Sequence, residues 1–211
     1  MKESDSNPAA DPLIIKSLEF VGGMASVGGW RPELNLPEVA FSGRSNVGKS
    51  SLLNKVLRRR SFARVSKTPG RTREINFFKV NDAFVLADLP GYGYARVSRT
   101  KSAEWAPLIE AYLRANTSLR GVVQLLDIRH DPTDDDRQML DFLADVGVPV
   151  MFVATKMDKL SRPATDRRVR ELAIMLQVGE DDIIPFSAQT GAGRDDLAQA
   201  IAGLLASEPA A

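Results

Sequence analysis

Residues 43–50 read Gly43-Arg44-Ser45-Asn46-Val47-Gly48-Lys49-Ser50, which matches the phosphate-binding loop pattern G-x-x-x-x-G-K-S/T. The apolar residues 39–41 precede this loop, and residues 51–57 follow it with apolar side chains at helical spacing. A strand, a glycine loop and a helix in this order aim backbone N–H groups at one anion. The Lys49 ammonium would then reach the β- and γ-phosphates, while the Ser50 hydroxyl would bind Mg²⁺. The stretch predicts a nucleoside triphosphate site, and its flanks disfavour a glycine-rich turn with a coincidental lysine.

The composition is that of an ordinary globular chain. Its 211 residues are 44% hydrophobic and 26% charged, which suffices for one domain with a full core. The absence of cysteine excludes disulfides and zinc–thiolate sites and favours the cytoplasm. No apolar stretch reaches the roughly 18 residues of a membrane span, so we expect no membrane partner. We predict disordered tails at residues 1–12 and 206–211 around a single domain at 13–205.

Short apolar runs alternate with longer amphipathic stretches along the rest of the chain. Strands are predicted at residues 39–41, 74–80, 83–88, 121–127, 148–154 and 183–185, and later helices at 101–116, 134–146, 163–176 and 193–205. Strands alternating with helices indicate an α/β fold with helices on both faces of the sheet. We therefore predict a mixed, mainly parallel, six-stranded sheet in which the 74–88 hairpin supplies one antiparallel strand.

A second motif, Asp88-Leu89-Pro90-Gly91, lies at the end of an apolar strand. Its carboxylate would hold magnesium through water, and the glycine leaves the backbone free to approach the γ-phosphate. An Asp-x-x-Gly sequence alone is weak, because it also occurs in ordinary turns. Its position at a strand end after a phosphate loop favours the nucleotide interpretation.

A third motif, Thr155-Lys156-Met157-Asp158, follows the strand at residues 148–154 and matches the pattern N/T-K-x-D that reads guanine. The carboxylate accepts hydrogen bonds from guanine N1–H and the exocyclic amine, while the lysine stem packs over the base. Adenine would leave that buried carboxylate unpaired, which is costly. Phe186-Ser187-Ala188 follows the next strand and fits a backbone contact to the guanine carbonyl. The order of these motifs predicts a guanine nucleotide.

The segment Lys67-Thr68-Pro69-Gly70-Arg71-Thr72 lies between the phosphate loop and Asp88. A GTPase needs a threonine on a mobile segment whose hydroxyl joins magnesium only when the γ-phosphate is present. We assign this role to Thr72, with Thr68 as the alternative.

Five strings resemble one family in particular. They are Val39-Ala40-Phe41-Ser42 with the phosphate loop, Thr68-Pro69-Gly70-Arg71-Thr72, Ile75-Asn76-Phe77-Phe78, Asp88-Leu89-Pro90-Gly91-Tyr92-Gly93-Tyr94-Ala95, and Asp127-Ile128-Arg129-His130. Together they resemble the EngB (YihA/YsxC) family of bacterial GTPases of the TRAFAC class, over about residues 13–205. The resemblance implies a P-loop GTPase fold, a cytoplasmic role in assembly of the large ribosomal subunit, and a link to cell division and septation. Arg73 departs from the glutamine that is usual in the family, which affects the chemistry of the first switch rather than the fold.

The mechanism has a gap at Tyr92, because Ras-type enzymes place a water-orienting glutamine at this position. Asn46 matches the residue that coordinates potassium in similar GTPases without that glutamine. We therefore expect slow GTP hydrolysis that K⁺ and the ribosome accelerate, with Mg²⁺ as cofactor. The predicted catalytic residues are Lys49, Asn46, Thr72 and Gly91, and the predicted metal ligands are Ser50, Thr72 and Asp88. The predicted nucleotide contacts are Gly43, Arg44, Ser45, Asn46, Val47, Gly48, Lys49, Ser50, Ser51, Gly70, Arg71, Thr72, Asp88, Leu89, Pro90, Gly91, Thr155, Lys156, Met157, Asp158, Phe186, Ser187 and Ala188.

The net charge is only +1, yet residues 49–73 hold nine basic and no acidic side chains. This basic block is a candidate footprint for nucleic acid, and a solvated loop that serves the bound triphosphate is the alternative. We expect a monomeric GTP/GDP switch on rRNA and proteins of the large-subunit precursor. A GTPase acting on a protein partner in cell division, without RNA contact, is the second hypothesis. An ATP-using phosphotransferase is the third, and Asp158 argues against it.

Overall fold

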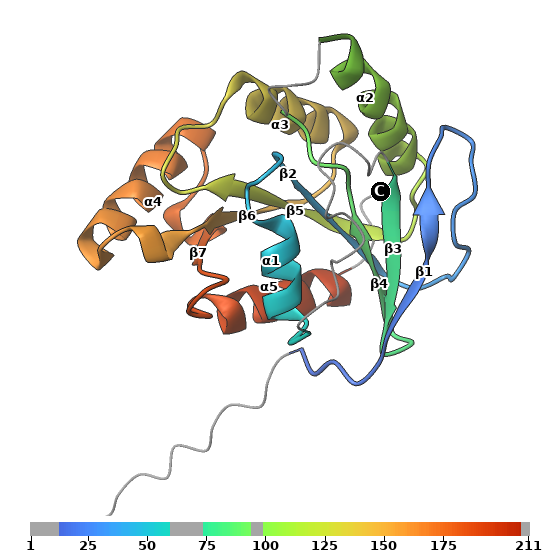
Figure 1. The fold of residues 1–211 in the computed structure, drawn as a ribbon, viewed down its shortest axis with the longest axis horizontal. Helices are drawn as coiled ribbons and strands as arrows, with labels where there is room; N and C mark the ends of the chain where they lie inside the picture. Colours follow the sequence, from blue (N-terminus) through green and yellow to red (C-terminus); the bar gives the residue numbers. More distant parts are fainter. Residues whose placement is uncertain (1–12, 60–73, 94–98, 208–211) are drawn as a thin grey trace, which may run out of the picture.

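A computed structural model describes residues 13–59, 74–93 and 99–207. These residues form one mixed sheet with helices on both faces (Figure 1). The strands are β1 (Leu18–Met24), β2 (Glu38–Gly43), β3 (Ile75–Val80), β4 (Phe84–Asp88), β5 (Leu119–Asp127), β6 (Val150–Thr155) and β7 (Ile183–Phe186). The helices are α1 (Lys49–Val56), α2 (Arg99–Arg114), α3 (Asp134–Val146), α4 (Arg162–Leu176) and α5 (Arg194–Ala206), with single 3₁₀ turns η2 (Met157–Lys159) and η3 (Glu180–Asp182).

The strands lie in the order β1-β3-β4-β2-β5-β6-β7. Strand β3 is antiparallel to both of its neighbours, and the pairs β2–β4, β2–β5, β5–β6 and β6–β7 are parallel. This confirms the predicted mixed, mainly parallel sheet. The parallel strands direct their carboxyl ends to one edge of the sheet, which is where the predicted motifs fall.

The described sheet has seven strands rather than the predicted six, because β1 was not among the predicted strands. Strand β1 contains Gly22 and Gly23, which weaken the strand pattern, and its pairing with β3 is irregular between Phe20 and Gly22. The exposed Trp30 ring packs over this point, since a Cβ added at Gly22 would lie 2.4 Å from its Cζ3 atom. Packing from a distant residue thus covers the weak part of the strand.

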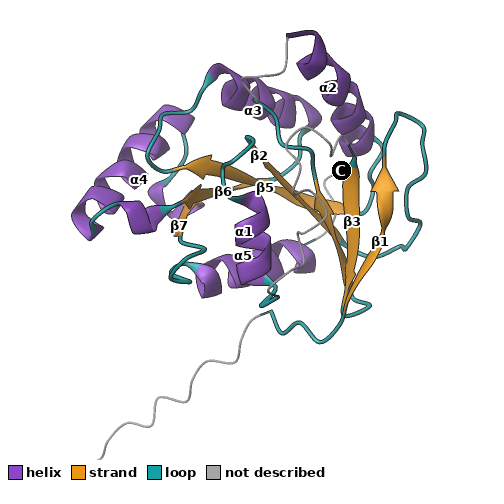
Figure 2. Cartoon of the chain, viewed as in Figure 1, coloured by secondary structure: helices purple, strands orange, loops and turns teal. Residues whose placement is uncertain are grey.

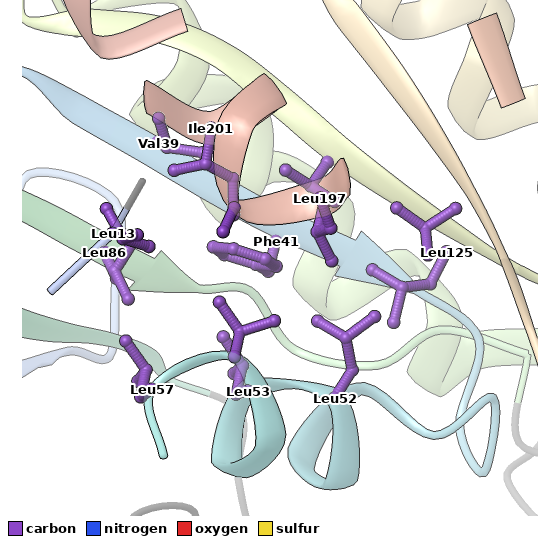
Figure 3. Close-up of a cluster of buried hydrophobic side chains, with 14 of the residues drawn as sticks. Leu13, Val39, Phe41, Leu52, Leu53, Leu57, Leu86, Leu125, Leu197 and Ile201 are labelled. Atoms are coloured by element: carbon purple, nitrogen blue, oxygen red, sulfur yellow. The ribbon is translucent and has the colours of Figure 1, made fainter. Parts of the chain in front are cut away.

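Apolar side chains on both faces of the central strand β2 form the core. Figure 2 shows α1 and α5 on one face of the sheet and α2 and α3 on the other. Phe41 of β2 points between α1 and α5, where Leu53 and Leu197 surround it (Figure 3). The next residue back, Ala40, belongs to the cluster on the opposite face. The apolar clusters on both faces pack against β2 and therefore fix the position at which the following loop begins. No helix in the described ranges is long and apolar enough to cross a membrane.

Candidate guanine nucleotide site

Four motif segments meet at the carboxyl edge of the sheet. The phosphate loop after β2 contacts the segment after β4, because the Ser45 N–H donates to the Tyr92 carbonyl at 2.8 Å. It also contacts the segment after β6, because Lys156 Nζ donates to the Asn46 carbonyl at 2.7 Å. Segments that are far apart in the sequence therefore build one continuous site. The predicted residues Gly70, Arg71 and Thr72 lie outside the described residues.

The phosphate loop has the backbone geometry of an anion cradle. Asn46 (φ 66°) and Gly48 (φ 109°) both adopt left-handed backbone angles, which asparagine and glycine tolerate best. Helix α1 begins directly after Gly48, and no side chain caps its first turn. N–H groups that converge at such a turn and at an uncapped helix start bind anions. This loop therefore fits the polyphosphate of a nucleotide.

Lys49 links the first two motifs. Its ammonium donates hydrogen bonds to an Asp88 carboxylate oxygen and to the Leu89 carbonyl. The two charged side chains are only 12% and 18% exposed, so this ion pair is largely screened from water. The contact holds the start of α1 against the end of β4. It also places a cation and a carboxylate side by side at the phosphate loop.

The donors around Asp88 fit magnesium. Mg²⁺ is usually held by one or two protein oxygens together with phosphate and water oxygens. The Asp88 carboxylate ends β4 and the Ser50 hydroxyl lies in the first turn of α1, and both segments are joined through Lys49. In the described ranges, no cluster of three or more acidic or histidine side chains forms a separate metal site.

Asp158 is held as a hydrogen-bond acceptor. Its Oδ1 accepts from Ser187 Oγ at 2.8 Å, and its Oδ2 pairs with Lys159 at 3.2 Å. The Ser187 hydroxyl and the neighbouring lysine lower the pKa of Asp158, so this carboxylate stays ionised at neutral pH. An ionised carboxylate only accepts hydrogen bonds, which matches the two donors on guanine. Ser187 is itself fixed, since its Oγ accepts from the Thr190 N–H at 3.1 Å.

Lys156 and Thr155 join the segment after β6 to the phosphate loop. Thr155 Oγ1 donates to the Val47 carbonyl at 2.7 Å, and the Lys156 ammonium pairs with Asp127 at 2.9 Å. Asp127 also accepts two hydrogen bonds from the Arg129 guanidinium, at 2.9 and 2.8 Å. Partial burial opposes ionisation here, yet Arg129 and Lys156 hold the pKa of Asp127 well below its usual range.

Asp127 is a residue of the site that no motif in the sequence assigns to it. It lies in one of the strings that carried the family resemblance, so that string was the available signal. The structure shows that its carboxylate orients Lys156, whose stem lies 4.0 Å from a Cβ added at Gly48.

Tyr92 is an anchor. Its side chain is fully buried, and its hydroxyl donates to Asp136 Oδ1 at 2.8 Å and accepts from Gln124 Nε2 at 2.6 Å. Burial, with Asp136 nearby, raises the pKa of Tyr92, so the phenol stays neutral. Asp136 lies in the first turn of α3 and forms a capping box with Thr133. The segment after Asp88 is thereby attached to β5 and α3. Gln124 and Asp136 were also missed, although a glutamine inside a buried apolar strand was a usable signal.

Several other predicted contacts are packing residues by their side chains. Val47, Leu89, Pro90 and Phe186 are buried. Met157 and Ala188 are half-buried against apolar clusters. Ser51, in contrast, is exposed on α1 and is not a packing residue. Buried side chains leave the backbone as the part of these residues that can face a nucleotide.

A strand, phosphate loop and helix, with Asp88 at the end of β4 and Asp158 beside Ser187, define the P-loop GTPase class. The sequence profile of the family described as "50S ribosome-binding GTPase" matches residues 38–156. Relatives named "Probable GTP-binding protein EngB" include one from Gemmatimonas aurantiaca, 64% identical over 194 residues that cover 92% of this chain and 95% of the relative. Another, from Syntrophomonas wolfei, is 51% identical over 92% of this chain and 99% of the relative. The chain therefore belongs to the EngB family of GTP-binding proteins.

Solved structures agree on the fold. A crystal structure of a probable GTP-binding protein engB superposes with a TM-score of 0.67 at 23% identity, covering 80% of this chain and 98% of that one. A structure of Aquifex aeolicus Era bound to GDP and AlF₄⁻ superposes with a TM-score of 0.62 at 24% identity, covering 82% of this chain and 57% of that one. The predicted P-loop GTPase fold and the family resemblance are both confirmed.

Proposed function

We propose that this protein is a GTP-hydrolysing switch that acts in assembly of the large ribosomal subunit and is thereby needed for normal cell division. The observation that carries the proposal is the ionised Asp158, hydrogen-bonded to Ser187 and joined through Lys156 to the phosphate loop. The family's description as 50S ribosome-binding GTPases and the basic block at residues 49–73 support the ribosomal part. The protein acts as a cytoplasmic monomer whose GTP form binds the precursor.

In this proposal the phosphate loop binds the triphosphate through its backbone N–H groups. Lys49 exchanges its contacts with Asp88 and Leu89 for the β- and γ-phosphates. Ser50, Asp88 and Thr72 would hold Mg²⁺, which would neutralise charge at the phosphates when bound. A water attacks the γ-phosphorus, the bond to the bridging oxygen breaks, and GDP leaves with inorganic phosphate.

Guanine specificity tests the base-reading assignment. Asp158→Asn should weaken GTP binding by about 100-fold and favour xanthosine triphosphate, since the amide can donate to the extra xanthine carbonyl. Competition binding with GTP, ATP and xanthosine triphosphate measures this. Asp166→Asn, an exposed change on α4, is the control and should alter none of the three affinities. Equal binding of ATP and GTP by the unaltered protein would refute the assignment.

Ribosome association tests the partner. Cosedimentation with large-subunit particles should be strong with a slowly hydrolysed GTP analogue and weak with GDP or no nucleotide, and it should fall steeply with salt. The same sedimentation in all three nucleotide states would exclude a switch.

The potassium role is tested by hydrolysis in K⁺ and in Na⁺. The Asn46 backbone has left-handed angles, and its carbonyl accepts a hydrogen bond from Lys156. The side-chain amide is therefore the part of Asn46 that we propose contacts potassium. We expect faster hydrolysis in K⁺, with a K⁺/Na⁺ rate ratio that falls toward one in Asn46→Ala. The ratio removes any general effect of the substitution on the loop. An unchanged ratio contradicts the proposal.

A further inference from the structure

A basic cavity lies between the end of α1 and the start of α5. Its volume is about 500 Å³. Its charged lining residues are Lys55, Arg58, Arg59, Arg194 and Asp195, and Ser51, Asn54, Ala188 and Gly191 complete the lining. Ser51 and Ala188 are also predicted nucleotide contacts, whereas none of the charged lining side chains has a predicted role in the nucleotide site.

The charge of the cavity is positive. Asp195 is the one carboxylate in its described lining, and its Oδ1 already pairs with Arg194 at 2.8 Å. Arg194 is largely buried and also donates to the Val56 carbonyl at 3.1 Å, so it fastens α5 to the end of α1. The remaining charge comes from Lys55, Arg58 and Arg59, and the last two side chains are exposed.

One wall of the cavity is also part of the guanine-reading loop. The Lys55 stem packs on Gly191, because a Cβ added there would lie 2.9 Å from Lys55 Cε. The Gly191 N–H donates to the Ser187 carbonyl at 2.8 Å, and the Ser187 hydroxyl binds Asp158. The cavity and the base-reading contacts therefore lie on two sides of one hydrogen-bonded loop.

We infer that this cavity binds phosphate groups of an RNA strand. Guanidinium groups bind phosphate oxygens through paired hydrogen bonds, and several cations around one cavity suit a polyanion better than a single ion. The basic block, which carries no acidic residue, includes Lys55, Arg58 and Arg59 and runs on to residue 73, which favours a long anionic strand. The inference rests on the proposed function for the source of that RNA. The competing explanation is structural, since cations at a helix C-terminus stabilise the helix.

The test removes two positive charges with little change of shape. The double variant Lys55→Gln/Arg59→Gln is compared with Arg167→Gln/Arg170→Gln, which removes two exposed charges from α4. Binding of a fluorescent single-stranded RNA is measured with saturating GDP over a range of KCl. We expect the cavity variant to bind RNA at least about 10-fold more weakly, with a salt slope smaller by about 1.4, from 0.7 per charge. The α4 variant should match the unaltered protein, and GDP affinity should be unchanged in both.

Equal RNA binding by the cavity and α4 variants would overturn the inference, as would a loss explained by lower thermal stability of the cavity variant alone. Displacement of RNA by polyglutamate at equal charge concentration would assign the cavity to an acidic peptide instead. Cosedimentation with large subunits separates this result from the proposed function. If the cavity variant still sediments with large subunits in a nucleotide-dependent way, RNA binding by the cavity is refuted and the proposed function stands. If the unaltered protein shows no nucleotide-dependent sedimentation, the proposed function is refuted.

Discussion

Tyr92 occupies the position of the water-orienting glutamine of Ras-type enzymes, but its contacts position the backbone instead. Its phenol is buried between Gln124 and Asp136, and its carbonyl accepts from Ser45 in the phosphate loop. A side chain held in this way fixes the backbone after Asp88. A buried phenol cannot orient the attacking water as a glutamine would, and the potassium that we propose Asn46 coordinates would instead neutralise charge that develops at the phosphates.

The hydroxyl of Tyr92 can be tested alone. Tyr92→Phe leaves a buried amide and a carboxylate oxygen without this partner, so the free energy of unfolding should fall by about 1–3 kcal/mol. GTP affinity should fall several-fold, because the segment after Asp88 loses its attachment. Tyr112→Phe is the matched control: this tyrosine is also buried and donates to Glu38, in the core under α2. Urea unfolding and nucleotide titration should show similar stability losses but weaker GTP binding only in Tyr92→Phe. Equal GTP affinities in the two variants would refute the anchoring role.

Glu38 should give the protein a characteristic pH dependence. Burial raises its pKa, although Tyr112 and Asn116 donate to its Oε1 and Arg31 lies nearby. A raised pKa means that the folded state binds this proton more tightly than the unfolded state does. The resulting stabilisation is complete below the ordinary value of 4.5 and is lost as the pH rises through the raised pKa.

Glu38→Gln keeps the carbonyl acceptor and removes the titration. Its free energy of unfolding, relative to the unaltered protein, should therefore increase as the pH rises from about 4.5 toward 7. Urea unfolding at several pH values measures this difference, with the exposed Glu33→Gln as control. A difference in the free energy of unfolding that is constant with pH, or that decreases as the pH rises, would contradict a raised pKa of Glu38.

The motif residues of the site could be predicted from the sequence, whereas their supports could not. Lys49 and Asp158 stand at spacings that a bound nucleotide would impose, and those spacings are visible in one chain. Asp127 and Asp136 act by contacting residues 29 and 44 positions away. Such partnerships depend on strand order, which local patterns do not encode.

At the scale of elements, two glycines of the α5 region are predicted to respond in opposite ways to alanine. Gly193 precedes the helix with φ 75°, and a Cβ there would lie 2.1 Å from the Pro185 carbonyl. Gly203 lies inside the helix, is exposed, and a Cβ there would meet nothing within 4 Å. Gly203→Ala should raise the free energy of unfolding by about 0.5–1 kcal/mol.

Gly193→Ala should lower stability by more than that gain, because it strains both the backbone angle and the contact with β7. It should also weaken GTP binding, since Pro185 lies two residues before Ser187. Thermal unfolding and nucleotide titration of both variants measure these effects. A destabilised Gly203→Ala, or a neutral Gly193→Ala, would contradict the described packing.

Element bounds were predictable where capping residues mark them. Helix α3 runs over the predicted residues 134–146, because Thr133 caps its start and the left-handed Gly147 ends it. Helix α1 instead begins at Lys49, before the predicted residue 51, because the end of the phosphate loop is itself the first helical turn. Strand β1 was missed because glycines and partial exposure hide its pattern.

At the scale of the whole molecule, burial ranks the strands by stability. Every residue of β2 is buried and β2 pairs on both sides, whereas β1 is half-exposed and pairs only with β3. The free energy of local opening is higher for strands that are buried and paired on both sides. Amide hydrogens should therefore exchange slowest in β2 and β5 and clearly faster in β1. Hydrogen exchange read by mass spectrometry measures this order. Equal protection of β1 and β2 would show that the edge strand is not a separate, weaker unit.

The position of β1 also bears on how the chain is made. Strand β1 is synthesised before the other described strands. Its partner β3, in which Ile75 pairs with Met24 and Val80 with Leu18, leaves the exit tunnel only after the phosphate loop and α1. We therefore expect β1 to pair late, after the β3–β4 hairpin has formed the sheet edge that β1 joins.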